Sequence, residues 1–199
     1  TSSSRQLYPS RRSTRYALSR YMRPLRLSNR PMNRMLGVPS RQRAKGVVPE
    51  DRVMGIVAAY LAAGLDAISL ADTAGHAHPA QVSAYVRRIL TMEPAARITA
   101  PIHNTYGLGM ANVYAALDAG ATSIESSFGG LGGCPFTKVA AGNVATEDVV
   151  HGLQRAGHRT DIRLDVLIDV ARGVATFFGR DLPGCVYKIG PITAGAPAS

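Results

Sequence analysis

The chain has 199 residues, a formal net charge of +10, and 46% hydrophobic and 18% charged residues. This composition is typical of a globular protein with one sizeable core, and no apolar run approaches the ~20 residues that span a bilayer, so the sequence predicts no membrane partner. The two cysteines, Cys134 and Cys185, lack the spacing of a metal site or a disulfide framework. The absence of a disulfide pattern favours a reducing compartment, and we expect the protein to be located in the bacterial cytoplasm.

The net positive charge comes from the first segment of the chain. Residues 1–46 hold 12 of the 23 Lys and Arg residues and no Asp or Glu, so the remaining 11 basic residues stand against 13 acidic ones. A nucleic-acid-binding domain carries positive charge on its folded body and often stacks bases on aromatic side chains. Because neither feature is present in the body of this chain, the sequence predicts no nucleic-acid partner.

Residues 1–46 are rich in Arg, Ser and Pro and show no sustained apolar period. Three interpretations compete: a disordered basic arm that binds RNA or anionic surfaces, a transit peptide, and a segment outside the fold, such as an out-of-frame translation. The transit peptide would make the mitochondrial matrix the alternative compartment. We favour the third interpretation and expect no strand in this segment; residues 191–199 are interpreted as a tail.

From Val47 to Gly190, helical and strand patterns alternate. Proline and glycine mark the boundaries of several predicted helices, which run from Pro49 to before Gly64, Pro79 to Leu90, Leu108 to Ala119, Thr146 to Gly157, and Leu164 to Phe178. The predicted strands are Ala67–Leu70, Arg97–Ile102 and Thr122–Glu125, with at most a fourth near Asn143 or at Cys185–Tyr187. Such alternation predicts parallel βα units.

Polar residues cluster directly after these strands, on the side where TIM barrels place their active sites. A complete barrel has eight strands and typically ~250 residues, more than the pattern contains. The predicted fold class is therefore α/β, a partial (β/α)8 TIM barrel over residues 47–190, with an irregular basic N-terminal segment.

A glycine-rich stretch follows the third predicted strand. Four of the five residues at 129–133 are glycine, which frees the backbone to adopt positive φ and to approach a ligand closely. Pro135 biases the preceding Cys134 toward an extended conformation. Two interpretations of Cys134 follow: a small buried apolar residue in a long turn, or a reactive thiol on a loop.

The motif Gly130-Leu131-Gly132-Gly133-Cys134-Pro135-Phe136, followed by Gly-Asn-Val-Ala-Thr-Glu-Asp at 142–148, resembles the active-site loop of the 3-hydroxy-3-methylglutaryl-CoA lyases. These enzymes are metal-dependent aldol lyases built on TIM barrels. Ile68–Gly75 and His103–Gly107 are similar to further family motifs, in the same order. The resemblance covers about Val47 to Gly190 and implies the C-terminal half of a barrel.

The resemblance implies cleavage of 3-hydroxy-3-methylglutaryl-CoA, or a close acyl-CoA, to acetyl-CoA and acetoacetate, as in leucine degradation and ketone body metabolism. It implies a divalent metal, Mg²⁺ or Mn²⁺, with His103 and Asn143 as candidate ligands. Asp72 and Cys134 are the implied catalytic residues. The implied substrate loop contains Gly130, Gly132 and Gly133. The implied partner is an acyl-CoA substrate, and a homodimer is compatible with the resemblance.

Each of these residues also has a structural interpretation. A lone His103 often serves only as a hydrogen-bonding residue, Asn143 is suited to capping the following helix, and Asp72 to capping a loop. His76 and His78 form a His-x-His pair outside the family position, and we interpret them as exposed loop residues.

Two departures from the family pattern predict impaired activity. Pro101 stands where the family has the first histidine of a His-x-His metal motif, and proline cannot bind a metal. No Arg-Asp pair of the family's first strand precedes Val47, and Arg180-Asp181 lies in the wrong place. The alternative function is a non-catalytic remnant or interaction protein with an incomplete barrel.

Overall fold

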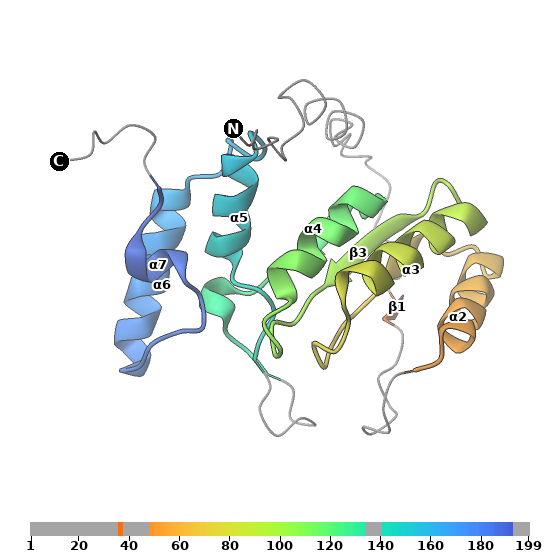
Figure 1. Ribbon diagram of the computed structural model, residues 1–199, viewed down its shortest axis with the longest axis horizontal. Helices are drawn as coiled ribbons and strands as arrows, with labels where there is room; N and C mark the ends of the chain where they lie inside the picture. The colour runs from red at the N-terminus through yellow and green to blue at the C-terminus, as the bar shows by residue number, and fades with distance from the viewer. Residues whose placement is uncertain (1–35, 38–47, 134–140, 193–199) are drawn as a thin grey trace, which may run out of the picture. The chain divides into compact units, whose positions relative to one another are not determined.

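The computed structural model describes residues 36–37, 48–133 and 141–192 (Figure 1). Contacts divide the chain into residues 1–33 and 34–199, and all described residues belong to the second unit. The predicted catalytic residue Cys134 and the tail from residue 193 lie outside the described residues.

A four-stranded parallel sheet forms the centre of the described fold. Its strands are β1 (Leu36–Gly37), β2 (Ala67–Ser69), β3 (Arg97–Pro101) and β4 (Ser123–Glu125), and they neighbour one another in chain order. Strands that follow one another in this way, each joined to the next by a helical crossover, are those of a TIM barrel. The three strands predicted with definite bounds are confirmed to within one residue at each end.

The structure corrects two expectations about strands. Leu36 and Gly37 pair in parallel with Ile68 and Ser69, so the prediction that residues 1–46 contain no strand is wrong. A two-residue strand is too short to show alternation, which is why the sequence did not reveal it. The alternative strand at Cys185–Tyr187 is also wrong, because Val186–Ile189 forms helix α7.

The predicted helices are confirmed, with ends shifted by no more than about two residues. They are α2 (Glu50–Ala62), α3 (Pro79–Met92), α4 (Gly109–Ala119), α5 (Thr146–Arg155) and α6 (Leu164–Phe178), and a short 3₁₀ turn, η1, spans Phe128–Gly130. Local chemistry explains several ends. Pro79 occupies the first turn of α3, where a missing N–H costs nothing, and Gly120 ends α4 with φ +108°.

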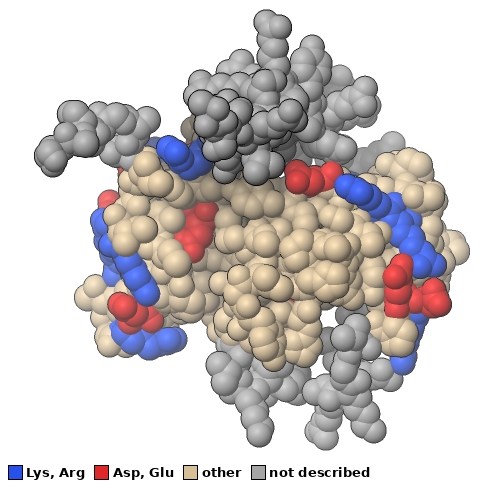
Figure 2. Space-filling view, in the orientation of Figure 1, with Lys and Arg blue, Asp and Glu red and all other residues tan. Residues whose placement is uncertain are grey.

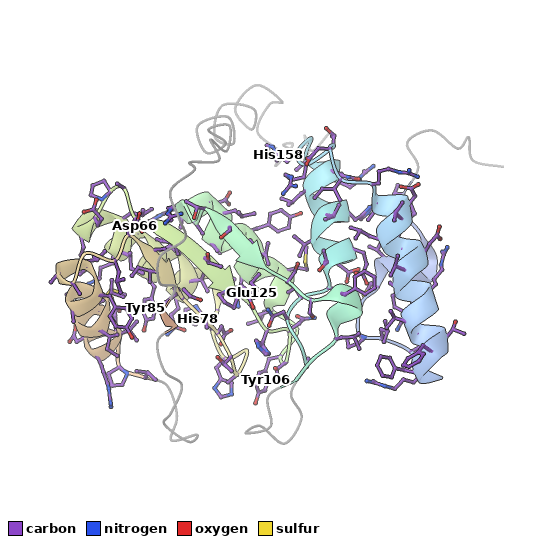
Figure 3. All side chains as sticks on the ribbon, turned by 180° about the vertical axis from the view of Figure 1, so that it is seen from behind. Asp66, His78, Tyr85, Tyr106, Glu125 and His158 are labelled. Atoms are coloured by element: carbon purple, nitrogen blue, oxygen red, sulfur yellow. The ribbon has the colours of Figure 1, made fainter. Side chains whose placement is uncertain are left out.

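The first hydrophobic cluster lies between the sheet and helices α2, α3 and α4, which cover one face of it (Figures 1 and 3). In β3, Ile98 and Ala100 are fully buried while Arg97 is exposed, as the two-residue period of a strand requires. The helices contribute Val57, Val86, Ile89, Val113 and Ala116, each fully buried.

A second hydrophobic cluster joins α5, α6 and α7. Its buried members are Val150, Leu164, Ile168, Ala171, Leu182, Val186 and Tyr187. The neighbouring residue Val149 belongs to the first cluster, so α5 connects the two. Phe128 and Leu131, at the glycine-rich stretch, pack against the second cluster.

Several charged side chains of opposite sign form ion pairs on the surface. Arg88 pairs with Glu50 at 2.6 Å, and Arg97 pairs with Asp66 at 3.0 Å. Figure 2 shows blue and red side chains mainly toward the two sides of the face in view, with a mostly uncharged middle. None of the helices in the described ranges is long and apolar enough to cross a membrane.

Candidate active site

Asp72 follows β2 at the carboxyl end of the sheet. Its backbone N–H donates to the carbonyl oxygen of Pro101 at 3.0 Å, and the residue bridges Ile102 in parallel register, next to His103. Its carboxylate accepts the backbone N–H groups of His76 at 2.9 Å and Ala77 at 3.2 Å. Asp72 therefore caps its own loop, and these two bonds fix its orientation while leaving acceptor capacity on both oxygens.

His103 and Asn143 lie side by side in an antiparallel bridge. The Nδ1 of His103 lies 3.0 Å from the carbonyl oxygen of Ala141. Because a carbonyl can only accept, Nδ1 carries the proton in this contact, and in the neutral ring Nε2 then carries the lone pair. Metal-binding histidines are commonly oriented in this way, by a hydrogen bond from the ring nitrogen that does not bind the metal.

The amide of Asn143 is also oriented by the backbone. Its Nδ2 donates to the carbonyl oxygen of Glu125 at 3.1 Å, which makes Oδ1 the atom available to a ligand. The expectation that Asn143 caps the following helix is wrong, because α5 starts at Thr146 with Ala145 as its N-cap and no capping side chain. His103 Nε2 and Asn143 Oδ1 are thus two neutral donors on neighbouring segments.

These two donors alone do not make up a metal site. Within the described ranges, no group of three His, Cys, Asp or Glu residues has the arrangement needed to hold an ion. Pro101 lies two residues before His103, so the two residues face the same side of the chain where β3 ends. Mg²⁺ and Mn²⁺ prefer anionic oxygen, so the described donors fit such an ion only in part.

The glycine-rich stretch adopts the backbone conformations that its composition predicts. Gly129, Gly130 and Gly132 have φ of +60°, +72° and +115°. Gly142, the residue before Asn143, approaches this stretch closely: a Cβ added to Gly142 would lie 2.1 Å from the carbonyl oxygen of Leu131. The two flanks of the segment that contains Cys134 therefore meet next to Asn143, with Gly133 exposed on the first flank.

The loops that follow β2 and β3 contact each other. The rings of His76 and Tyr106 lie 5.2 Å apart, and the amide Nδ2 of Asn112 donates to the carbonyl oxygen of Ala77 at 2.8 Å. His76 and His78 are exposed, as predicted, and His78 Nδ1 caps α3 by accepting the backbone N–H of Gln81. Figure 3 shows Tyr106 extending beyond this end of the sheet.

Sequence reasoning missed the roles of two acidic residues in the first turn of α5, Glu147 and Asp148. Glu147 Oε2 accepts the backbone N–H of Gly129 at 3.1 Å. Asp148 accepts the backbone N–H groups of Cys185 and Val186, with a shortest distance of 2.7 Å. Both carboxylates thus bind other segments. Acidic residues are common in the first turn of a helix, so the sequence gives no signal that these two also bind the backbone of distant residues.

A cavity of about 270 Å³ lies away from these strand ends. Its lining residues are His151, Gln154, Arg155, Leu164, Pro191 and Ile192. None of the predicted site residues is among them. We place the candidate site at the strand ends, because Asp72, His103 and Asn143 lie there on neighbouring backbone segments.

The parallel βα units and the polar strand ends define an α/β protein of the TIM-barrel type. Residues 28–174 match the HMGL-like family, and the chain belongs to this family of lyases. The match begins in the basic segment and includes β1.

Curated relatives and solved structures agree with the family. The chain is 42% identical over 147 residues to (R)-citramalyl-CoA lyase of Chloroflexus aurantiacus, covering 74% of this chain and 46% of the relative. It is 38% identical over 136 residues to hydroxymethylglutaryl-CoA lyase YngG of Bacillus subtilis, covering 68% and 46%. An HMG-CoA lyase from Acinetobacter baumannii, solved with coenzyme A and 3-methylmalate, matches with a TM-score of 0.71 and 40% identity over 78% of this chain and 51% of that chain. The chain spans about half the length of the relatives it matches.

Proposed function

We propose that this chain forms the C-terminal half of the catalytic barrel of an acyl-CoA lyase. The observation that carries the proposal is the convergence of Asp72, His103 and Asn143 at the carboxyl end of one parallel sheet, beside the glycine-rich stretch. Active sites of TIM barrels are built at this end. Membership of the HMGL-like family gives the reaction class.

The relatives point to a shared substrate chemistry. Hydroxymethylglutaryl-CoA and citramalyl-CoA both carry a methyl group and a hydroxyl on the third carbon of the acyl chain, and a terminal carboxylate. The two acyl groups differ by one methylene. The proposed substrate is therefore a 3-hydroxy-3-methylacyl-CoA with a terminal carboxylate. Cleavage between the second and third carbons yields acetyl-CoA and a keto acid, which is acetoacetate from the first substrate and pyruvate from the second.

The residues of this chain have separate parts in that reaction. The hydroxyl loses its proton as the carbonyl of the keto acid forms, and the electrons of the broken bond pass to the enolate of acetyl-CoA, which then takes a proton. Asp72, held by two backbone N–H groups, is the proposed acceptor of the hydroxyl proton. His103 and Asn143 would hold a divalent ion, which polarises the substrate oxygens when bound. Cys134, outside the described residues, stays the predicted proton donor.

The chain alone is expected to be a poor enzyme. Two neutral donors without a carboxylate hold a hard dication weakly. The family's first-strand arginine, which has no counterpart in this sequence, stabilises the enolate, and losing one such stabiliser typically lowers turnover by ~10²–10³. We expect weak Mn²⁺ binding and little turnover from this chain by itself.

Metal titration of single variants tests the ligand assignment. In calorimetry or Mn²⁺ paramagnetic resonance, His103→Ala should lose the weak binding. His76→Ala, which removes an exposed imidazole from the neighbouring loop, serves as the control and should not change it. Pro101→His should tighten binding by about tenfold or more, because it adds an imidazole on the same side of the chain as His103. Equal affinities for His103→Ala and the unmodified chain would rule out His103 as a ligand.

Complementation tests the proposed half-barrel. The chain would be co-expressed with the N-terminal half of the Bacillus subtilis relative, and cleavage of both thioesters would be followed by release of acetyl-CoA. Turnover that depends on both halves and on Asp72 supports the proposal. An assembly that binds Mn²⁺ but cleaves neither thioester would favour the non-catalytic remnant. Normal turnover by the chain alone, lost in Cys134→Ala, would overturn the incomplete-barrel interpretation.

A further inference from the structure

Among the acidic residues that the structure describes, Glu147 is the one whose side chain is fully buried. It lies in the first turn of α5 with none of its surface exposed. Oε2 accepts the backbone N–H of Gly129 at 3.1 Å, and Oε1 has no hydrogen-bond partner among the described atoms. Burying a carboxylate in this way is costly, and burial raises the pKa of Glu147 above its usual value.

Three segments meet at Glu147 without space for another methyl group. A Cβ on Gly129 would lie 2.3 Å from Leu182 Cδ1, and a Cβ on Gly184 would lie 2.7 Å from Glu147 Oε1. The carbonyl oxygen of Gly129 also accepts the backbone N–H of Gly184 at 3.0 Å. Gly129 is therefore held on one side by the carboxylate of Glu147 and on the other by the backbone of Gly184.

The segment around Gly184 is itself firmly attached to α5. The carboxylate of Asp148 accepts the backbone N–H groups of Cys185 and Val186. The hydroxyl of Tyr187 accepts the backbone N–H of Leu182 at 2.8 Å, and both residues are buried. Residues 182–187 thus form a brace, by which we mean a packed segment that limits how far Gly129 can move.

We propose that Glu147 is a positioning residue for the glycine-rich stretch: with the brace, it fixes Gly129 and so sets where residues 130–133 begin relative to Asn143. The hydrogen bond and the packing come from the described atoms alone. Only the catalytic use of this stretch rests on the proposed function. Because Leu131 contacts Gly142, a displacement of Gly129 is transmitted to the segment that carries Asn143.

Amide hydrogen exchange of the full-length chain tests this proposal. Glu147→Met fills a similar volume without an acceptor, whereas Glu147→Gln keeps an acceptor for the N–H of Gly129. In Glu147→Met, amides of residues 129–133 and Gly184 should exchange about tenfold faster or more, while Glu147→Gln should stay within about twofold of the unmodified chain. A residue that only fills space would give slow exchange in both variants, which would overturn the proposal.

Two glycine variants provide a matched comparison. Gly184→Ala places a methyl group against Glu147 Oε1, so it should speed exchange at residues 129–133 although the carboxylate is retained. Gly173→Ala in α6 meets nothing within 4 Å and should leave that exchange unchanged. Faster exchange spread equally over β3 and α4 would indicate global destabilisation and would overturn the positioning role. These outcomes are independent of lyase turnover, so failure of the proposed function and failure of this inference are distinguishable.

Discussion

The two hydrophobic clusters of this chain are organised by different chemistry. The cluster between the sheet and helices α2–α4 consists of apolar side chains that recur with the strand and helix periods. The cluster of α5, α6 and α7 is also apolar, but carboxylates of Glu147 and Asp148 that bind backbone N–H groups fix its position against the glycine-rich stretch. The first cluster builds the scaffold, and the second determines how the candidate loop is held.

The largest effect is expected from Ile98→Ala in the first cluster. Ile98 is the second residue of β3 and is fully buried, so its truncation should lower the free energy of unfolding by ~2–5 kcal/mol. Urea unfolding measures the change. If the two clusters form one cooperative unit, exchange of buried amides in α6 should accelerate together with that in β3. Acceleration confined to β3 would show that the clusters unfold separately.

A smaller effect is expected from Tyr187→Phe in the second cluster. The substitution keeps the ring but removes the acceptor of the buried Leu182 N–H, which should cost ~1–3 kcal/mol of unfolding free energy. Urea unfolding gives the loss, and proton exchange at Leu182 should identify its location. An unchanged midpoint with protected Leu182 would show that the hydroxyl does not support the brace.

The buried Glu147 predicts a pH dependence with a definite sign. Burial raises the pKa of Glu147 in the folded chain, although the N–H of Gly129 partly offsets this. The folded state therefore holds the proton to higher pH than the unfolded state. The contribution of Glu147 to the free energy of unfolding is fully present below its pKa in the unfolded state. This contribution is lost as the pH rises through its pKa in the folded state. Glu147→Gln should remove this loss.

The measurement is the difference between the urea midpoints of Glu147→Gln and the unmodified chain, taken at several pH values. Arg159 lowers the pKa of Asp161, and Arg163 lowers the pKa of Asp165, so these pairs contribute the opposite trend at acidic pH. They are present in both chains, and the difference isolates Glu147. A difference that does not vary with pH would contradict the raised pKa.

The smallest effect is expected from an ion pair on the surface of the first cluster. Arg88 contacts Glu50 at 2.6 Å and Asp51 at 3.5 Å, and all three side chains are exposed. Exposed pairs contribute little because water and salt screen them. Arg88→Ala should leave the urea midpoint unchanged within the scatter of repeated measurements. A clear loss would mean that surface charge, and not only periodic apolar packing, holds α2 against α3.

Much of the first region was predictable because its signals are local. Pro79 and Gly120 mark helix ends, and the apolar residues Ile98 and Ala100 at alternate positions mark β3. The positions of Asp72 and His103 followed from the rule that carboxyl ends of parallel strands meet at one edge. The two-residue strand β1 and the four-residue helix α7 were missed or misassigned because they are too short to show a period.

The second region was less predictable because its contacts join distant parts of the chain. Glu147 and Asp148 have the positions of ordinary first-turn acids, and the sequence does not show that their partners are Gly129 and Val186. The catalytic assignments of Asp72 and Cys134 stay predictions. The orientation of His103 and Asn143 by backbone groups emerged only from the fold.

The close approach of Leu131 and Gly142 has a consequence for how this family can vary. When two residues eleven positions apart lie this close together, the chain between them can change in length without moving either of them. Loop-closure entropy rises only slowly with length, by about 0.6 kcal/mol for each doubling. A change in the number of residues between Leu131 and Gly142 should therefore cost little stability while Asn143 keeps its place.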